Sequence, residues 1–102
     1  MTHITPPNIV QHDNKWHISG DVLMDNSNVI LLKSESLSMR DEFVVDFAEV
    51  TKVDTVALSL MMEWQRRAVA ASATVSFAHL PLNLSRLLVL YGVAEFIPLS
   101  IS

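Results

Sequence analysis

The side chains that could do chemistry in this chain of 102 residues are few and widely separated. The four histidines are His3, His12, His17 and His79, and none stands three or four residues from another in the helical spacing of a zinc site. If residues 8–19 form a hairpin, His12 and His17 point to one polar face as diagonal neighbours, with no carboxylate expected beside them. The spacing therefore predicts no metal centre.

Acid–base chemistry has one candidate, the carboxylates of Asp41, Glu42 and Asp46. They lie at the entrance and exit of an expected short strand, where solvated charge and loop capping are commoner than catalysis. Only Gly20 and Gly92 are present, so no glycine-rich phosphate loop can be built, and the lack of cysteine removes thiol catalysis. We expect a protein that is not an enzyme and needs no cofactor.

Composition narrows the possible partners. Half of the residues are apolar, enough for one core, and we expect a tail over residues 1–7 and a single domain over residues 8–102. The formal charge is −4 and no basic stripe exists, which excludes nucleic acid as an expected partner. The amino terminus has neither the basic nor the apolar part of a secretory signal, and no apolar run approaches a membrane span. We expect a cytoplasmic protein that meets a membrane only indirectly.

The first half of the chain predicts a hairpin, a helix and a buried strand. The hairpin covers residues 8–19, turns at Asp13-Asn14 and is closed by Gly20-Asp21. Asp25, Asn26 and Ser27 supply cap-type side chains before a short amphipathic helix that reaches Leu37. Residues 42–47 are β-branched and aromatic, which predicts a central strand, and residues 49–52 then predict a polar loop.

The second half predicts a helix, a strand and a last helix. The helix runs from Thr55 to about Ala71 with one exposed face, formed by Ser59, Glu63, Arg66 and Ala70. A strand follows at residues 74–78. The last helix runs from Leu82 to Tyr91, packs through Leu84, Leu87, Leu88 and Tyr91, and ends at Gly92 in a left-handed conformation. An apolar tail over residues 93–102 is expected to fold back on the core. The order predicts an α/β fold with a mixed sheet of about four strands.

Asp54-Thr55 is the most informative step in the sequence. It opens a helix whose first backbone N–H groups need an acceptor and whose dipole favours a negative charge, so Asp54 suits the cap position. Capping alone is worth about 1 kcal/mol. The first half of this helix, residues 56–64, is more apolar than one sheet face should absorb. Either neighbouring helices or another molecule could cover it.

The chain around this step resembles a known family, the STAS domains. The likeness rests on residues 44–55, VVDFAEVTKVDT, with the apolar helix after them, and on residues 84–98, LSRLLVLYGVAEFIP. It covers roughly residues 15–98 and is closest to the STAS subunits of phospholipid ABC transporters. The resemblance implies a STAS fold and a non-enzymatic subunit whose surface, formed by Asp54, Thr55, Val56 and Leu58, contacts the transporter's ATPase subunit.

Two other interpretations stay open. An anti-sigma factor antagonist is a STAS domain that a kinase switches by phosphorylation at this same helix start, where added charge repositions a partner. In that class a Ser or Thr usually follows the position of Thr55, whereas this chain has Val56. A lipid-binding or small-molecule-binding domain would need an internal apolar cavity, which no sequence feature demands.

Overall fold

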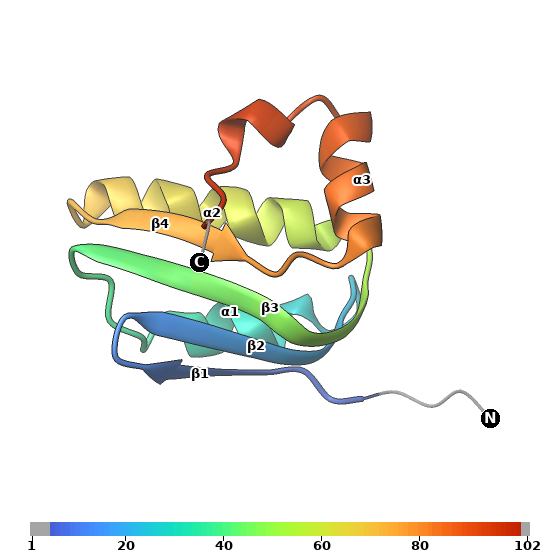
Figure 1. Cartoon of the computed structure of the whole chain (residues 1–102). Helices are drawn as coiled ribbons and strands as arrows, with labels where there is room; N and C mark the ends of the chain where they lie inside the picture. The colour runs from blue at the N-terminus through green and yellow to red at the C-terminus, as the bar shows by residue number, and fades with distance from the viewer. Residues whose placement is uncertain (1–4, 101–102) are drawn as a thin grey trace.

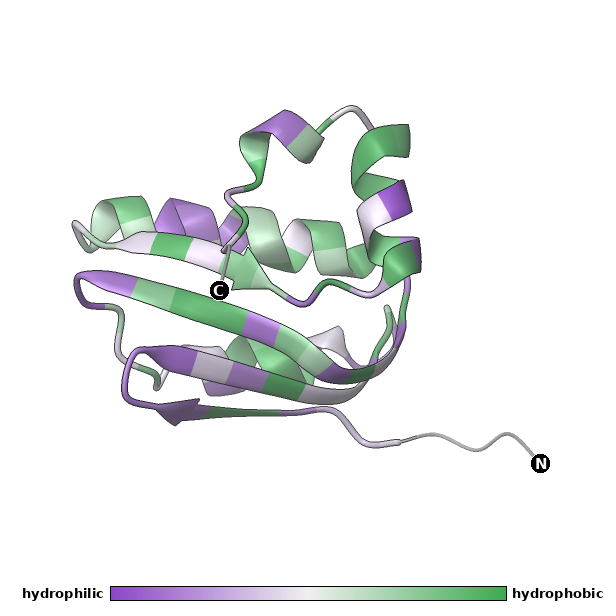
Figure 2. Ribbon diagram, in the orientation of Figure 1, coloured by the Kyte–Doolittle hydropathy of each residue, from purple (hydrophilic) through white to green (hydrophobic). Residues whose placement is uncertain are grey.

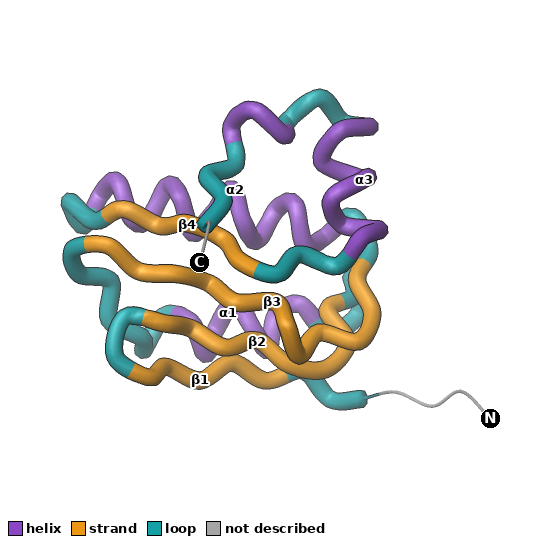
Figure 3. Tube along the Cα trace, viewed as in Figure 1, coloured by secondary structure: helices purple, strands orange, loops and turns teal. Residues whose placement is uncertain are grey.

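A four-stranded mixed sheet organises the computed structural model, which describes residues 5–100. The strands are β1 (Asn8–His12), β2 (Lys15–Val22), β3 (Glu42–Val53) and β4 (Thr74–Ala78). They lie side by side in the order of the sequence, with β1 and β2 antiparallel and the pairs β2–β3 and β3–β4 parallel (Figures 1 and 3). The expected α/β architecture with a mixed sheet is confirmed.

Three helices complete the fold: α1 (Ser27–Ser34), α2 (Val56–Ala70) and α3 (Leu82–Leu90). Helices α1 and α2 cover the same face of the sheet, whereas α3 stands to one side of it, near the ends of β3 and β4 (Figure 1). A single turn of 3₁₀ helix, η1 (Ala94–Phe96), leads the chain back towards β4. None of the helices within residues 5–100 covers the opposite face of the sheet.

The core lies between the sheet and the pair α1 and α2. Alternate residues of β3, Phe43, Val45 and Phe47, are at most 2% exposed because every second side chain of a strand points to the same face. Trp16 of β2 and Trp64 of α2 are fully buried and meet edge to face with ring centroids 5.9 Å apart. Hydrophobic colour follows these alternating positions along the strands (Figure 2).

The amino-terminal hairpin has the expected turn at Asp13-Asn14, where Asp13 has a φ of 55°. Its second strand is longer than predicted, because β2 continues through Gly20-Asp21 to Val22. Gly20 has a φ of 83°, and a side chain there would lie 2.2 Å from the carbonyl oxygen of Pro6. Glycine at position 20 therefore lets the segment around Pro6 pass close to β2, and the strand continues beyond it.

One predicted loop and the bounds of the first predicted helix are corrected. The segment of residues 49–52, expected as a polar loop, is the second half of β3, where Glu49 pairs with Ser19 and Lys52 with Asp21. Pairing with the extended β2 supplies backbone hydrogen bonds that the polar side chains do not reveal. The first helix ends at Ser34, so Leu37 lies beyond it, and Asn26 accepts a hydrogen bond from the amide of Leu23 without capping the helix.

The carboxyl-terminal elements largely match the prediction. Leu84 and Leu88 are buried and Gly92 has a φ of 69°, but Tyr91 is 56% exposed and does not belong to the packed face of α3. The tail does fold back, since Ile97 is buried and Leu99 forms a bridge with Phe77 of β4. The last part of that predicted tail, Ile101 and Ser102, lies outside the described residues, as does His3.

Candidate interaction site at the start of α2

The carboxylate of Asp54 determines how α2 begins. Its Oδ1 accepts a hydrogen bond from the amide of Val56 at 2.9 Å, which satisfies one free N–H of the helix start. Its Oδ2 accepts another from the amide of Met24 at 2.9 Å, across 30 residues of sequence. Asp54 therefore caps the helix as predicted and also fastens the loop between β2 and α1 to it, which sequence alone could not show.

Thr55 has helical backbone angles, φ −62° and ψ −18°, and its carbonyl oxygen accepts a hydrogen bond from the amide of Leu58. Its hydroxyl makes no capping hydrogen bond. Thr55, Val56 and Leu58 are all partly buried at the helix start. With Asp54 they make up the four predicted partner-binding residues, which lie on one small surface. Their role in binding a partner stays a prediction.

The apolar excess of α2 is divided between core and surface. Ala57, Leu60, Met61 and Trp64 are buried in the core, so most of the helix is covered by its own domain. Met62 remains 44% exposed. It lines a shallow groove with Leu58 of α2 and with Tyr91 and Val93, which follow α3. The polar residues of α2 that complete the lining are Ser59, Glu63 and Arg66. Tyr91, which the sequence analysis assigned to the packed face of the last helix, is exposed beside this groove.

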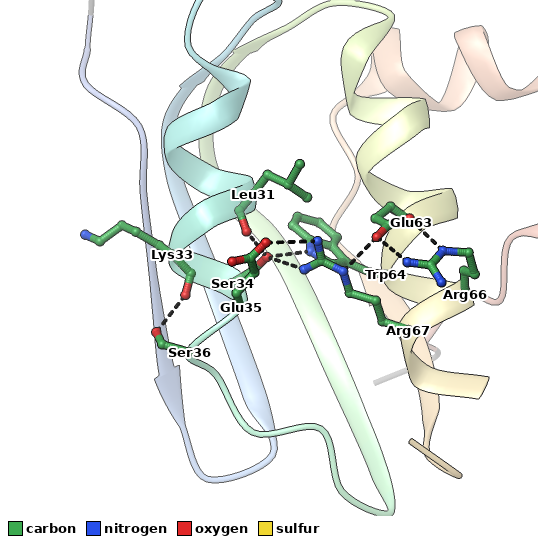
Figure 4. A network of polar contacts seen from close by, with 9 residues as sticks. All are labelled: Leu31, Lys33, Ser34, Glu35, Ser36, Glu63, Trp64, Arg66 and Arg67. Carbon is green, nitrogen blue, oxygen red and sulfur yellow. Dashed lines mark hydrogen bonds and ion pairs between the residues drawn. The ribbon is translucent and has the colours of Figure 1, made fainter. Parts of the chain in front are cut away.

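The opposite end of α2 is connected to α1 by a polar network (Figure 4). The buried Ser34 hydroxyl donates to the carbonyl oxygen of Leu31 and accepts from Trp64 Nε1 at 3.0 Å and from Arg67 at 3.3 Å. Glu63 accepts from Arg66 and Arg67, and these hydrogen bonds lower the pKa of its carboxyl group to about 2. The charged groups of this network are partnered within the chain.

A second polar cluster lies on the helix-free face of the sheet. Asp46 of β3 stands between two histidines: His79 Nδ1 is 3.1 Å from Oδ1, and His17 Nδ1 is 3.9 Å from Oδ2. The rings of His12 and His17 meet edge to face at 5.7 Å. The expectation that no carboxylate lies near these histidines is therefore wrong, and Asp46 lies within β3 and not at its exit.

The chemistry of Asp46 follows from this setting. Burial raises the pKa of its carboxyl group, but the hydrogen bond from the Ala48 amide and the nearby His79 outweigh burial and hold the pKa below its usual value. The two histidines flank opposite oxygens of the carboxylate. Within residues 5–100, no group of three or more histidine and carboxylate side chains is placed to hold a metal ion.

The geometry thus defines a class of protein: a small α/β domain whose most distinctive feature is a partly buried helix start, capped by Asp54, beside a shallow groove. A family model described as MlaB-type STAS domain matches residues 8–99, and the chain belongs to this family. STAS domains generally have accessory or regulatory roles and are not enzymes. No curated protein gives a significant match to the sequence.

The fold agrees with this family, since the STAS fold is an α/β arrangement of this kind. Among the helices of residues 5–100, none is both long and apolar enough to cross a membrane. The membership supports a role in interaction with other proteins.

Proposed function

We propose that this chain is a non-enzymatic accessory subunit that binds and supports the ATPase subunit of a phospholipid ABC transporter of the MlaFEDB type. Such a transporter maintains the lipid asymmetry of the outer membrane. The subunit would act in the cytoplasm and lie at the inner membrane only through the complex. Its contribution is binding energy that differs between states of the ATPase, which shifts their populations.

One observation carries the proposal: in an MlaB-type STAS domain, both carboxylate oxygens of Asp54 are occupied by backbone amides, while Thr55 beside it makes no capping bond. Asp54 is thus a positioning residue. It fixes the start of α2, so that Thr55, Val56 and Leu58 are presented on a rigid helix end. A rigid contact surface loses little conformational entropy on binding.

Co-purification with the candidate ATPase subunit tests the proposal. We expect the wild-type chain to bind and to raise ATP turnover, Thr55→Ala to weaken binding, and Thr55→Glu to abolish it because a bulky charge enters the contact. Ser36→Glu is the matched control, since Ser36 is exposed beyond the far end of α1. Normal binding by both Thr55 variants would contradict the assignment of this surface.

The anti-sigma antagonist interpretation makes the opposite prediction. Incubation with cognate switch kinases would add one phosphate to Thr55, visible as an increase in intact mass, and the chain would not bind the ATPase. No observation in the structure favours this outcome, and Val56 occupies the position where that class usually carries the modified hydroxyl.

A further inference from the structure

The outward face of α3 carries an apolar stripe that no part of the chain within the described residues covers. Leu82, Arg86, Val89 and Leu90 recur at spacings of three and four, so they share one side of the helix. The three apolar members are 65%, 71% and 75% exposed in that order, and Arg86 is also exposed. A solvated helix face normally carries polar residues here, and its inner face already buries Leu84 and Leu88.

This stripe is continuous with the surface at the start of α2. Asn83, in the first turn of α3, donates a hydrogen bond to the carbonyl oxygen of Val53 at 3.3 Å, directly before Asp54-Thr55. At the other end of α3, Tyr91 lines the groove that Leu58 and Met62 of α2 also line. Helix α3 therefore borders the proposed contact surface through Asn83 and through Tyr91, and Figure 1 shows its first turn near the start of α2.

Arg86 is the only charged residue in α3 and stands in the middle of the stripe. Among the described residues, no carboxylate lies within 4.0 Å of it, whereas Arg66 and Arg67 both pair with Glu63. An arginine among exposed apolar side chains is the composition of an interface core, where arginine and aromatic residues are enriched. Its guanidinium suits a carboxylate, which it can bind through two parallel hydrogen bonds.

We infer that α3 extends the docking surface and that the occupant is a part of the ATPase subunit that places a carboxylate on Arg86 and apolar side chains on Leu82, Val89 and Leu90. This inference rests on the proposed function. It names the chemistry of the partner at that site and adds α3 to the surface of Asp54, Thr55, Val56 and Leu58.

Charge distinguishes this occupant from two others. A second copy of the chain, docked by two-fold symmetry on the stripe, would bring the two Arg86 side chains face to face near the axis, with like charges opposed. An anionic membrane attracts a single basic residue near its surface only weakly, and the stripe has one such residue while the chain carries a net charge of −4. A partner with a carboxylate meets neither objection.

The experiment measures the dissociation constant of the full chain for the purified ATPase subunit of the same organism's phospholipid ABC transporter, in low and high NaCl. We expect Arg86→Glu and Leu90→Ser each to weaken binding at least about 10-fold, the former less in high salt, where charges are screened. Arg40→Glu is the control: it makes the same change of charge at an exposed site before β3, at the opposite end of that strand from Asp54.

The outcomes separate the inference from the proposed function. If Thr55→Glu abolishes binding while Arg86→Glu and Leu90→Ser bind as the wild type does, the α3 surface is overturned and the proposed function stands. If the wild-type chain does not bind the ATPase, both fall. A dimer in sedimentation that Arg86→Glu abolishes would overturn the inference in favour of a second copy. Restoration of Arg86→Glu binding by an Asp→Arg or Glu→Arg change on the ATPase would identify the carboxylate.

Discussion

The two ends of α2 differ in where their side chains find partners. Towards the carboxyl-terminal end, Arg67 donates hydrogen bonds to Glu63 and to Ser34 of α1, and Trp64 also donates to Ser34. All of these partners lie inside the domain. At the amino-terminal end, Asp54 satisfies the backbone, and Leu58 and Met62 line a groove that is open to solvent. One helix thus connects a region that is packed within the domain to a region whose surface is open for contact with another molecule.

This difference shows which changes should affect folding and which should affect binding. Burial and saturated hydrogen bonds make the carboxyl-terminal end sensitive to truncation, because cavities and unpaired polar groups are costly. Exposed apolar groups cost little when they are replaced in the free protein, so their removal should appear mainly in complex formation.

The largest effect is expected at Trp64. Trp64→Ala should lower the free energy of unfolding by about 3–5 kcal/mol, because it empties a fully buried site against Trp16 and removes the donor to Ser34. Urea denaturation followed by circular dichroism measures the loss. Trp64→Phe removes the hydrogen bond and part of the buried volume but keeps one aromatic ring in the core, so it should lose less. A loss below about 1 kcal/mol for Trp64→Ala would contradict the assignment of this end to stability.

The next effect is expected at Asp54. Asp54→Ala should cost about 1–2 kcal/mol, because the amides of Val56 and Met24 both lose their acceptor. Asp54→Asn retains one acceptor oxygen and should lose less. Hydrogen exchange gives the local test: both amides should exchange faster in Asp54→Ala. Unchanged exchange at Met24 would show that the carboxylate does not fasten the loop between β2 and α1 to the helix.

The capping role of Asp54 could be predicted from the sequence because a helix cap depends on neighbouring residues. A cap is decided by the residue before the helix, so the step Val53-Asp54-Thr55 was enough to place Asp54. The bond to Met24 was out of reach, because it joins residues 30 apart and depends on how two loops meet. The same limit explains Asp46, whose partner His79 is 33 residues away.

The strand boundaries show a second limit. Residues 49–52 are polar except for Val50 and resemble a loop, yet they extend β3 because β2 continues past Gly20 and offers backbone partners. Polarity predicts exposure of side chains, and these side chains are indeed largely exposed at the end of the sheet. It does not predict whether the backbone is paired, since an exposed strand end meets its hydrogen bonds through a neighbour that the local sequence does not contain.

A smaller effect on stability is expected at Thr55. Thr55→Glu should leave the free energy of unfolding within about 0.5 kcal/mol of the wild type, because the threonine makes no capping bond and an acidic residue suits a helix start. Thermal denaturation of the free chain measures this. Binding to the ATPase should be lost in the same variant. A large loss of stability would assign Thr55 to folding and remove the contrast between the two ends of α2.

The smallest effect concerns Glu63 and is visible through pH. Its pKa is about 2 in the folded chain, against 4.5 for an unperturbed group, owing to hydrogen bonds from Arg66 and Arg67. A lowered folded-state pKa contributes stability that is fully present above pH 4.5 and is lost as the pH falls towards 2.

The melting temperature of the wild type should therefore exceed that of Glu63→Gln by a constant small margin above pH 4.5, and the margin should shrink to nothing near pH 2. Added salt should reduce the margin as well, since the carboxylate and Arg66 are near solvent and screened. A margin that stays the same across this range would mean that the ion pairs of Glu63 add nothing to the folded state. The contact between α1 and α2 would then be stabilised by the hydrogen bond between Trp64 and Ser34, the uncharged part of the network.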